Sequence, residues 1–422
     1  TYFYTTLERE QVKKMVRYEL KKVFLRAGNK LALLLLIGIV GITCFFAMDI
    51  SYVNENGKQE SGPAAVEKLK TAQKEWTGNL DETKIRQVIA ENNRIRETPE
   101  AMSKDYRENE IAYSWGQGIM EIRNLLNSSY ANGFREYDYY RADSLSETDA
   151  AGFYANRTAL LSDWLMTEAK DQFSEAQKEY LIQQYESIQT PWYYDYMKGW
   201  TQLFEFAPTV IMITMLILGY LVAGIFSNEF TWKADAVYFS SMYGRNRATA
   251  AKIKAGFCVV TIIYWVVILI YTGIVILYLG ADGLTCPIQA DRSGWKSFYN
   301  ISVGQKYLLI VLGGYIGCLF ISFLCMLVSA KTKSAVVAAM VPVILIFIPS
   351  FLGNINSPVV NKILGLLPDQ LLQIGMVTTY FNLYTVGGKV FGSLPVLFTL
   401  YTVLMVLLVP LMYREYGRKQ IG

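Results

Sequence analysis

The sequence of 422 residues contains no histidine. This absence excludes Ser-His-Asp and Cys-His catalysis, the HExxH zinc motif and histidine general bases. The five cysteines form no CxxC pair: Cys44, Cys258, Cys318 and Cys325 lie in apolar runs, and only Cys286 falls in a polar stretch. The sequence therefore indicates neither a disulfide framework nor a zinc cluster, and we expect no metal site.

Charged residues are also scarce. Asp, Glu, Lys and Arg make up 18% of the chain, against roughly 25% in soluble domains. Six segments contain none of them and have the length of about 17–25 residues that crosses a bilayer core. These segments are residues 31–48, 207–226, 255–279, 307–329, 335–352 and 391–412. The sequence predicts an all-α polytopic membrane protein with six transmembrane helices, span one at 31–48 and spans two to six within 207–412.

The distribution of basic residues predicts the orientation of these spans. Eighteen Lys and Arg residues lie in the segments 1–30, 227–254, 330–334 and 413–422, against five in the short loops on the opposite side. Basic residues concentrate on the cytoplasmic side of a membrane. We therefore expect both termini and the loop 227–254 to be cytoplasmic, in the plasma membrane of a bacterium. Cys286 should then be reachable from outside.

The remaining segment, residues 49–206, is expected to be extracellular. It contains 17 basic and 27 acidic residues, a net charge of −10, and no cysteine. Apolar residues recur at helical spacing in 65–76, 84–96 and 175–188, which predicts a mostly helical domain. An aromatic cluster at 192–200 is expected to sit in the headgroup layer, where such rings are enriched. The negative charge suits a basic ligand, although an acidic surface that only keeps the domain soluble is the simpler interpretation.

Two further segments are predicted to lie at the membrane surface. Residues 12–24 alternate apolar and basic side chains at helical spacing, which is typical of an amphipathic helix on the inner leaflet. Residues 359–386 are apolar but interrupted by Pro368 and Asp369. They form either a re-entrant segment buried in protein or an external amphipathic helix.

The six apolar segments contain no carboxylate and no basic side chain, so they lack the buried charges of gradient-driven pumps and the charged rings of ion channels. No phosphate-binding loop is present either. The nearest match is Gly387-Gly388-Lys389, where Val390 occupies the position that needs a hydroxyl. If the protein transports a substrate, a separate ATPase must hydrolyse ATP. We expect no cofactor in this chain, ATP and Mg²⁺ on the partner, and no nucleic-acid partner.

The cytoplasmic loop 227–254 is the predicted docking site for that ATPase. A short helix around Tyr238 would expose aromatic side chains to the cytoplasm, including Phe230, Trp232 and Phe239. Exposed apolar patches of this kind mark contacts with a partner protein. The alternative is that these rings rest on the membrane surface.

The chain resembles the membrane subunits of ABC exporters of the type-2 permease class. The resemblance rests on the basic N-terminal helix, the six spans, and a loop that opens with Glu229 and closes with Gly244-Arg245 and Lys252. The sequence departs from the family at Thr231-Trp232-Lys233, where Gly-Thr is frequent. A large ectodomain after span one also occurs among Gram-positive members of the family.

The resemblance implies a permease that dimerises with a second copy or a paralogue and binds two ATP-binding cassette ATPase subunits. The pathway would lie between the two copies, lined by spans two and five, with a peptide or amphipathic compound as a plausible cargo. The residues implied to couple the ATPase to the spans are Glu229, Phe230, Trp232, Lys233, Tyr238, Ser240, Arg245 and Lys252.

Two alternatives remain open at this stage. Permeases of the mechanotransmission class also bind an ABC ATPase and also carry an ectodomain after span one, but they have four spans per copy. An envelope-sensing receptor would use the acidic domain to bind its ligand, but it needs only one or two spans.

Overall fold

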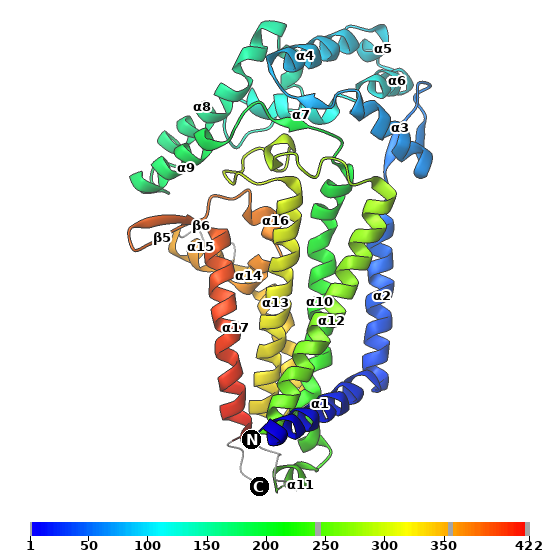
Figure 1. Ribbon diagram of the computed structural model, residues 1–422. Coiled ribbons are helices and arrows are strands. Elements are labelled where there is room, and N and C mark those ends of the chain that lie inside the picture. The colour runs from blue at the N-terminus through cyan, green and yellow to red at the C-terminus, as the bar shows by residue number, and fades with distance from the viewer. Residues whose placement is uncertain (1, 241–245, 353–357, 418–422) are drawn as a thin grey trace.

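The computed structural model describes residues 2–240, 246–352 and 358–417, and it is mostly helical. Five helices are long and apolar enough to cross a membrane, and they run side by side as one bundle (Figure 1). They are α2 (Ala27–Ala47), α10 (Lys198–Thr231), α12 (Arg247–Leu279), α13 (Val303–Thr332) and α17 (Ser393–Gly417). Helices α10 and α13 form the centre, since 67% of the apolar window of each is buried, against 22% for α17.

The predicted fifth span differs from the other five. It forms α14 (Ala335–Leu352), which contains Pro342 and Pro349 and falls below the length of the five candidate spans. Helix α14 packs on α10 at Gly219, where a Cβ atom would lie 2.7 Å from Cγ of Pro342. Within the described residues the structure therefore supports five spans, with α14 as a shorter apolar helix beside them.

Several helices continue well beyond the charge-free segments that predicted them. Helix α10 begins at Lys198 and α12 begins at Arg247, each some eight residues before the predicted span. Charged residues such as Lys are good helix formers, so the end of a charge-free segment does not mark the end of its helix. This extension places functional side chains on helix ends and not in a loop.

Residues 49–197 fold into a helical domain, here called the inserted domain, above one end of the bundle (Figure 1). Its helices are α3 (Pro63–Lys74), α4 (Glu82–Arg96), α5 (Pro99–Met102), α6 (Tyr106–Gly116), α7 (Met120–Ser129), η1 (Arg141–Ser144), η2 (Glu147–Gly152), α8 (Phe153–Met166) and α9 (Glu175–Ser187). Two antiparallel pairs join them: β1 (Ser51–Val53) with β2 (Gln59–Ser61), and β3 (Gly78–Asn79) with β4 (Tyr193–Tyr194). Helices α3, α4 and α9 match the three predicted helical stretches.

The aromatic cluster at the end of the inserted domain is placed differently from the prediction. Trp192, Tyr194 and Tyr196 are buried inside the protein. The Trp192 ring packs edge to face on Trp295, with centroids 5.3 Å apart. The interpretation of these rings as a headgroup belt was therefore wrong, because they fill the junction between the inserted domain and the bundle.

The connection between α14 and α17 is not one long amphipathic helix, and the re-entrant segment stays a prediction. It consists of α15 (Pro358–Leu364), η4 (Pro368–Leu371), α16 (Ile374–Val377) and the antiparallel hairpin of β5 (Leu383–Val386) and β6 (Lys389–Gly392). Gly387 and Gly388 both have positive φ angles at the hairpin turn, a conformation that glycine adopts at no steric cost. The partial phosphate-loop match is therefore a β-turn.

At the opposite end of the bundle, α1 (Tyr2–Phe24) lies across α12 and α10, beside the short helix α11 (Asp235–Ser240) (Figure 1). Val12, Met15, Val16 and Val23 face inward, whereas Lys13, Lys14, Arg17 and Lys21 are exposed. The predicted amphipathic pattern of 12–24 is therefore present, and part of its apolar face packs on protein.

Candidate functional site

Glu229, in the last turn of α10, lies in a buried ion pair. Its Oε1 accepts hydrogen bonds from Nζ of Lys252 on α12 at 2.8 Å and from Nζ of Lys22 on α1 at 2.9 Å. Glu229 is 3% exposed and Lys252 is 0% exposed. Both basic groups that Glu229 contacts therefore belong to the same chain.

A second carboxylate completes the cluster. Glu19 on α1 accepts from Lys22 at 2.9 Å through Oε1 and from Lys252 at 3.2 Å through Oε2. The ammonium of Lys252 also donates to the carbonyl oxygen of Ile225 at 2.6 Å. Two carboxylates and two ammonium groups balance one another, which is the condition under which buried charges are tolerated. We call Glu19, Lys22, Glu229 and Lys252 the ion-pair cluster.

The cluster joins three helices that are far apart in the sequence. Burial lowers the pKa of Lys22, but the carboxylates of Glu19 and Glu229 outweigh it, and the pKa is raised overall. A neighbouring contact strengthens the same junction, because Arg26 donates to Oδ1 of Asn228 at 3.2 Å. The ends of α1, α10 and α12 are therefore held together by charge.

An aromatic cluster fixes α11 to the last helix. The buried ring of Tyr416 on α17 lies 5.1 Å from Phe239, 6.1 Å from Tyr238 and 6.3 Å from Phe230, centroid to centroid. Phe239 is itself buried. The expectation that all four aromatic residues of this loop face the cytoplasm was wrong for Phe239, because Tyr416 covers it.

The outward face of this corner is formed by other residues. Trp232 is 52% exposed and Val237 is 76% exposed. Lys233, with φ 55°, makes the turn between α10 and α11, and the exposed Ser240 donates to the carbonyl oxygen of Val237 at 3.1 Å. We call Trp232, Lys233, Val237 and Ser240 the α11 face. Gly244 and Arg245 lie outside the described residues.

Glu19, Lys22 and Tyr416 were not among the predicted site residues. One signal was available, since Glu19 is the only acidic residue within the basic stretch 12–24. An acidic residue on the apolar side of a basic helix indicates a cationic partner in the protein. Nothing in the sequence says which of the many lysines that partner is.

At the other end of the bundle, the connection between α12 and α13 anchors the inserted domain. The buried guanidinium of Arg157 on α8 donates to the carbonyl oxygens of Trp295 at 3.0 Å and Ser297 at 2.7 Å, and it stacks 3.7 Å from the Tyr185 ring. Burial lowers the pKa of Arg157. Because Trp295 and Ser297 belong to the connection, the domain and the spans are tied by a buried contact.

A second anchor is an ion pair. Asp282, just after α12, accepts from Lys70 at 2.7 Å and from Lys74 at 2.6 Å, both on α3. Burial acts to raise the pKa of Asp282, but the two ammonium groups outweigh it and hold the pKa below its usual value. We call the Arg157 and Asp282 contacts the two anchors.

Cys286 lies in the same connection and is fully buried. Burial raises the pKa of its thiol to about 12, so the reactive thiolate is absent at neutral pH. The expectation that Cys286 is reachable from outside was therefore wrong. A polar stretch of sequence can still be buried when another domain covers it.

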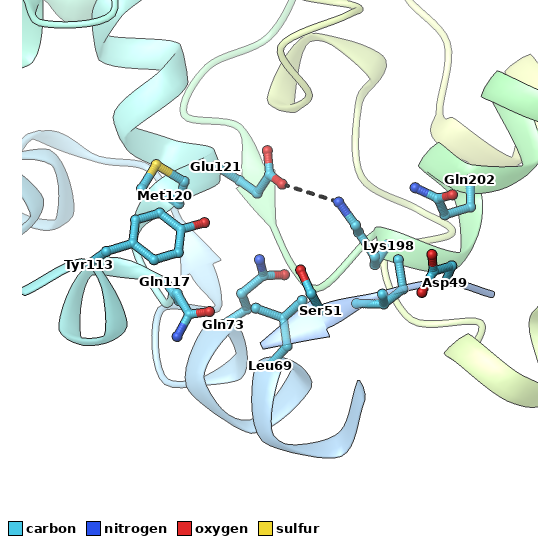
Figure 2. A pocket seen from close by; sticks show the side chains of 11 residues that line it. Asp49, Ser51, Leu69, Gln73, Tyr113, Gln117, Met120, Glu121, Lys198 and Gln202 are labelled. Atoms are coloured by element: carbon cyan, nitrogen blue, oxygen red, sulfur yellow. Dashed lines mark ion pairs between the residues drawn. The ribbon is translucent and has the colours of Figure 1, made fainter. Parts of the chain in front are cut away.

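A small pocket of about 240 Å³ lies where α3, α6 and α7 meet the start of α10. Figure 2 shows Glu121 and Lys198 pointing toward each other across it, with a closest N···O distance of 4.0 Å. Burial raises the pKa of Glu121. The volume is below the range of about 300–1,000 Å³ typical of ligand sites, and no group of metal-ligating side chains occurs in the described part of the chain. We assign this pocket a structural role.

The five long apolar helices define a multi-pass membrane protein. No protein-family model matches the sequence, and no curated protein matches it either. The geometry of the two ends of the bundle therefore carries the functional argument.

Proposed function

We propose that this protein is the membrane-spanning subunit of an ATP-driven exporter and works as a dimer with separate ATP-binding cassette ATPase subunits. It would lie in a bacterial plasma membrane with both termini cytoplasmic and the inserted domain outside. The observation that carries the proposal is the corner formed by α10, α11 and α12. There the exposed α11 face lies next to the buried ion-pair cluster.

The α11 face has the chemistry of a docking surface. Trp232 and Val237 are large apolar side chains exposed at an end of the bundle that is otherwise rich in charge. Tryptophan is enriched among the residues that dominate protein interfaces. Lys233 and Ser240 add polar groups at the edge of the same face, as a polar rim does in such interfaces.

The contacts behind that face link α11 to the spans. Displacing α11 moves α10 directly, α17 through Tyr416, and α12 and α1 through the ion-pair cluster. Closely packed side chains are nearly incompressible, so a displacement of one helix is transmitted to the helices packed against it. Closure of an ATPase bound at the α11 face would therefore be passed to four helices at once.

Transport between two copies requires a dimer, with a pathway predicted to be lined by spans two and five. On span two, Thr214 is fully buried and donates to the carbonyl oxygen of Val210 at 2.7 Å. It therefore packs within one copy. Helix α14 keeps an apolar exposed face that includes Val336, Met340 and Val343, and a second copy or lipid would cover this face.

The test of docking uses the full-length protein co-expressed with a candidate ATP-binding cassette ATPase from the same genome. Val237→Asp should abolish co-purification of that ATPase, because a charge would be stranded in a desolvated contact. Met102→Asp is the matched control, since Met102 is 69% exposed on the inserted domain. Undiminished complex formation by the Val237 variant would refute the docking site.

The two anchors favour one alternative, an ABC-linked protein that moves its inserted domain to work outside the cell. Cross-linking Lys74→Cys to Asp282→Cys with a bifunctional maleimide would lock the second anchor. Unchanged export by the locked protein would argue against the alternative. Loss of an envelope activity in the locked protein, with no export by either the locked or the unlocked form, would support it.

A further inference from the structure

A cavity of about 1,250 Å³ lies between the inserted domain, the α12–α13 connection and the segment before α17. Its walls include Trp164 of α8, Phe134, and Phe381 near β5. The Phe134 ring stacks on Trp164 with centroids 5.2 Å apart and on Phe381 with centroids 5.6 Å apart. Aromatic packing thus builds one side of the cavity from three separate parts of the sequence.

The charge of this cavity is opposite to that of the domain above it. Its ionised lining residues are Arg135, Arg292, Lys296 and Lys362, with Glu136 as the one carboxylate. Residues 49–206 together have a net charge of −10 from 17 basic and 27 acidic residues. Of the four cations only Arg135 belongs to the inserted domain, whereas Arg292 and Lys296 lie in the α12–α13 connection and Lys362 lies on α15. The cavity is therefore basic because of residues outside the acidic domain, and the basic ligand that the net charge suggested does not suit it.

The cations are held in place without carboxylate partners. Arg135 lies 4.8 Å from the Trp164 ring, Lys296 lies 5.3 Å from the Phe134 ring and Arg292 lies 4.0 Å from the Tyr137 ring. None of these three forms a salt bridge with another described residue. Burial, and next the charge of Arg135, lower the pKa of Lys296. An anion in the cavity would relieve that repulsion.

The floor of the cavity lies level with the first turn of a span. Asn382 lines the cavity, and its carbonyl oxygen accepts from Ser393, the first residue of α17, at 2.8 Å. Helix α17 is the least buried of the five candidate spans. A molecule inserted in a leaflet beside α17 would therefore have its polar end near Asn382 and the cavity.

We propose that this cavity binds the phosphate headgroup of an anionic lipid from the adjacent leaflet, with the cations on the phosphate and the aromatic wall on the glycerol and upper acyl chain. Arg binds phosphate bidentately and Lys binds it as a point charge. Lipid binding in this cavity does not require an ATPase. The lipid proposal is therefore tested independently of the proposed export function.

The experiment measures quenching of tryptophan fluorescence in the purified full-length protein, since Trp164 and Trp295 line the cavity. Three probes are titrated: dihexanoyl phosphatidylglycerol, dihexanoyl phosphatidylcholine and glycerol 3-phosphate. We expect the anionic lipid to bind at least tenfold more tightly than the other two, and its binding to weaken as salt is raised. Equal binding of the zwitterionic lipid, or equal binding of glycerol 3-phosphate, would overturn the assignment to an anionic lipid.

The variant is Arg292→Gln with Lys296→Met, which removes two cations and leaves the Lys296 carbonyl free to accept from Tyr185 as before. Its control is Lys104→Met with Arg107→Gln, two exposed cations of the inserted domain that do not line the cavity. The cavity variant should lose at least tenfold in affinity with an unchanged melting temperature, and the control should not. Parental affinity in a folded cavity variant would overturn the proposal.

Discussion

Glu229 on α10 and Lys252 on α12 form a salt bridge of 2.8 Å in which both residues are almost fully buried. The helices that carry them are joined through α11, the predicted contact point of an ATPase. A buried charge pair at this corner is costly to break, so the two helix ends move together.

Removing one member of this pair should destabilise the protein strongly. Lys252→Met leaves the Glu229 carboxylate buried beside Lys22 alone, and we expect a loss of about 3–5 kcal/mol in the free energy of unfolding. Glu229→Lys should be at least as damaging, because it would place three ammonium groups together. Denaturant unfolding in detergent measures both variants.

The double variant Glu229→Met with Lys252→Met is the internal control for that prediction. Glu19 and Lys22 would still pair, and two apolar side chains would fill the vacated space. We therefore expect the double variant to be more stable than Lys252→Met. If the two losses simply add, the salt bridge does not link the helices as described.

Arg157 should be irreplaceable even by lysine. Arg157→Lys keeps the charge but loses the two-point contact with the Trp295 and Ser297 carbonyl oxygens. Hydrogen bonds to charged groups contribute about 1.5–3 kcal/mol each, so the inserted domain should unfold at a lower temperature. Arg135→Lys is the control, since Arg135 is exposed. Equal melting temperatures for the Arg157 variant and the parent would contradict the anchor.

The Asp282 anchor should fail in acid. Because the folded pKa of Asp282 is lowered, its contribution to stability is present above the unfolded pKa of about 3.9 and is lost as the pH falls below it. We expect the stability difference between the parent and Asp282→Asn to be full at pH 7 and to shrink toward pH 3. Melting temperatures across that range measure it, and a difference that persists unchanged at pH 3 would argue against the ion pair.

Labelling with a membrane-impermeant maleimide on intact cells tests the proposed orientation. Asn132→Cys, exposed on the inserted domain, should react, and Ser240→Cys, exposed at the opposite end, should not. The parent gives the background, in which buried Cys286 should stay unlabelled. Strong labelling of the Ser240→Cys variant in intact cells would show that this end of the bundle faces outward, which contradicts the proposed orientation.

The elements that follow from local pattern were predictable from the sequence. The long apolar helices and the amphipathic helices α3, α4 and α9 each carry their own periodicity. The ion-pair cluster was only half predictable, because Lys22 and Glu229 are 207 residues apart and spacing does not say which distant helices meet. The burial of Cys286 and Phe239 was missed for the same reason, since other parts of the chain cover them. The basic cavity was missed because its cations come from the inserted domain, the α12–α13 connection and α15, which the sequence does not show to meet.

The central claim is that this protein converts the ATP hydrolysis of a separate subunit into movement of its spans. The most direct measurement is ATP turnover in proteoliposomes that contain this protein, a candidate ATP-binding cassette ATPase from the same genome, or both. We predict no turnover by the protein alone, turnover by the pair well above that of the ATPase alone, and loss of this stimulation in Trp232→Ala but not in Met102→Ala. Turnover by the protein freed of every ATPase, or a Trp232 variant that stimulates the ATPase like the parent, would contradict the account.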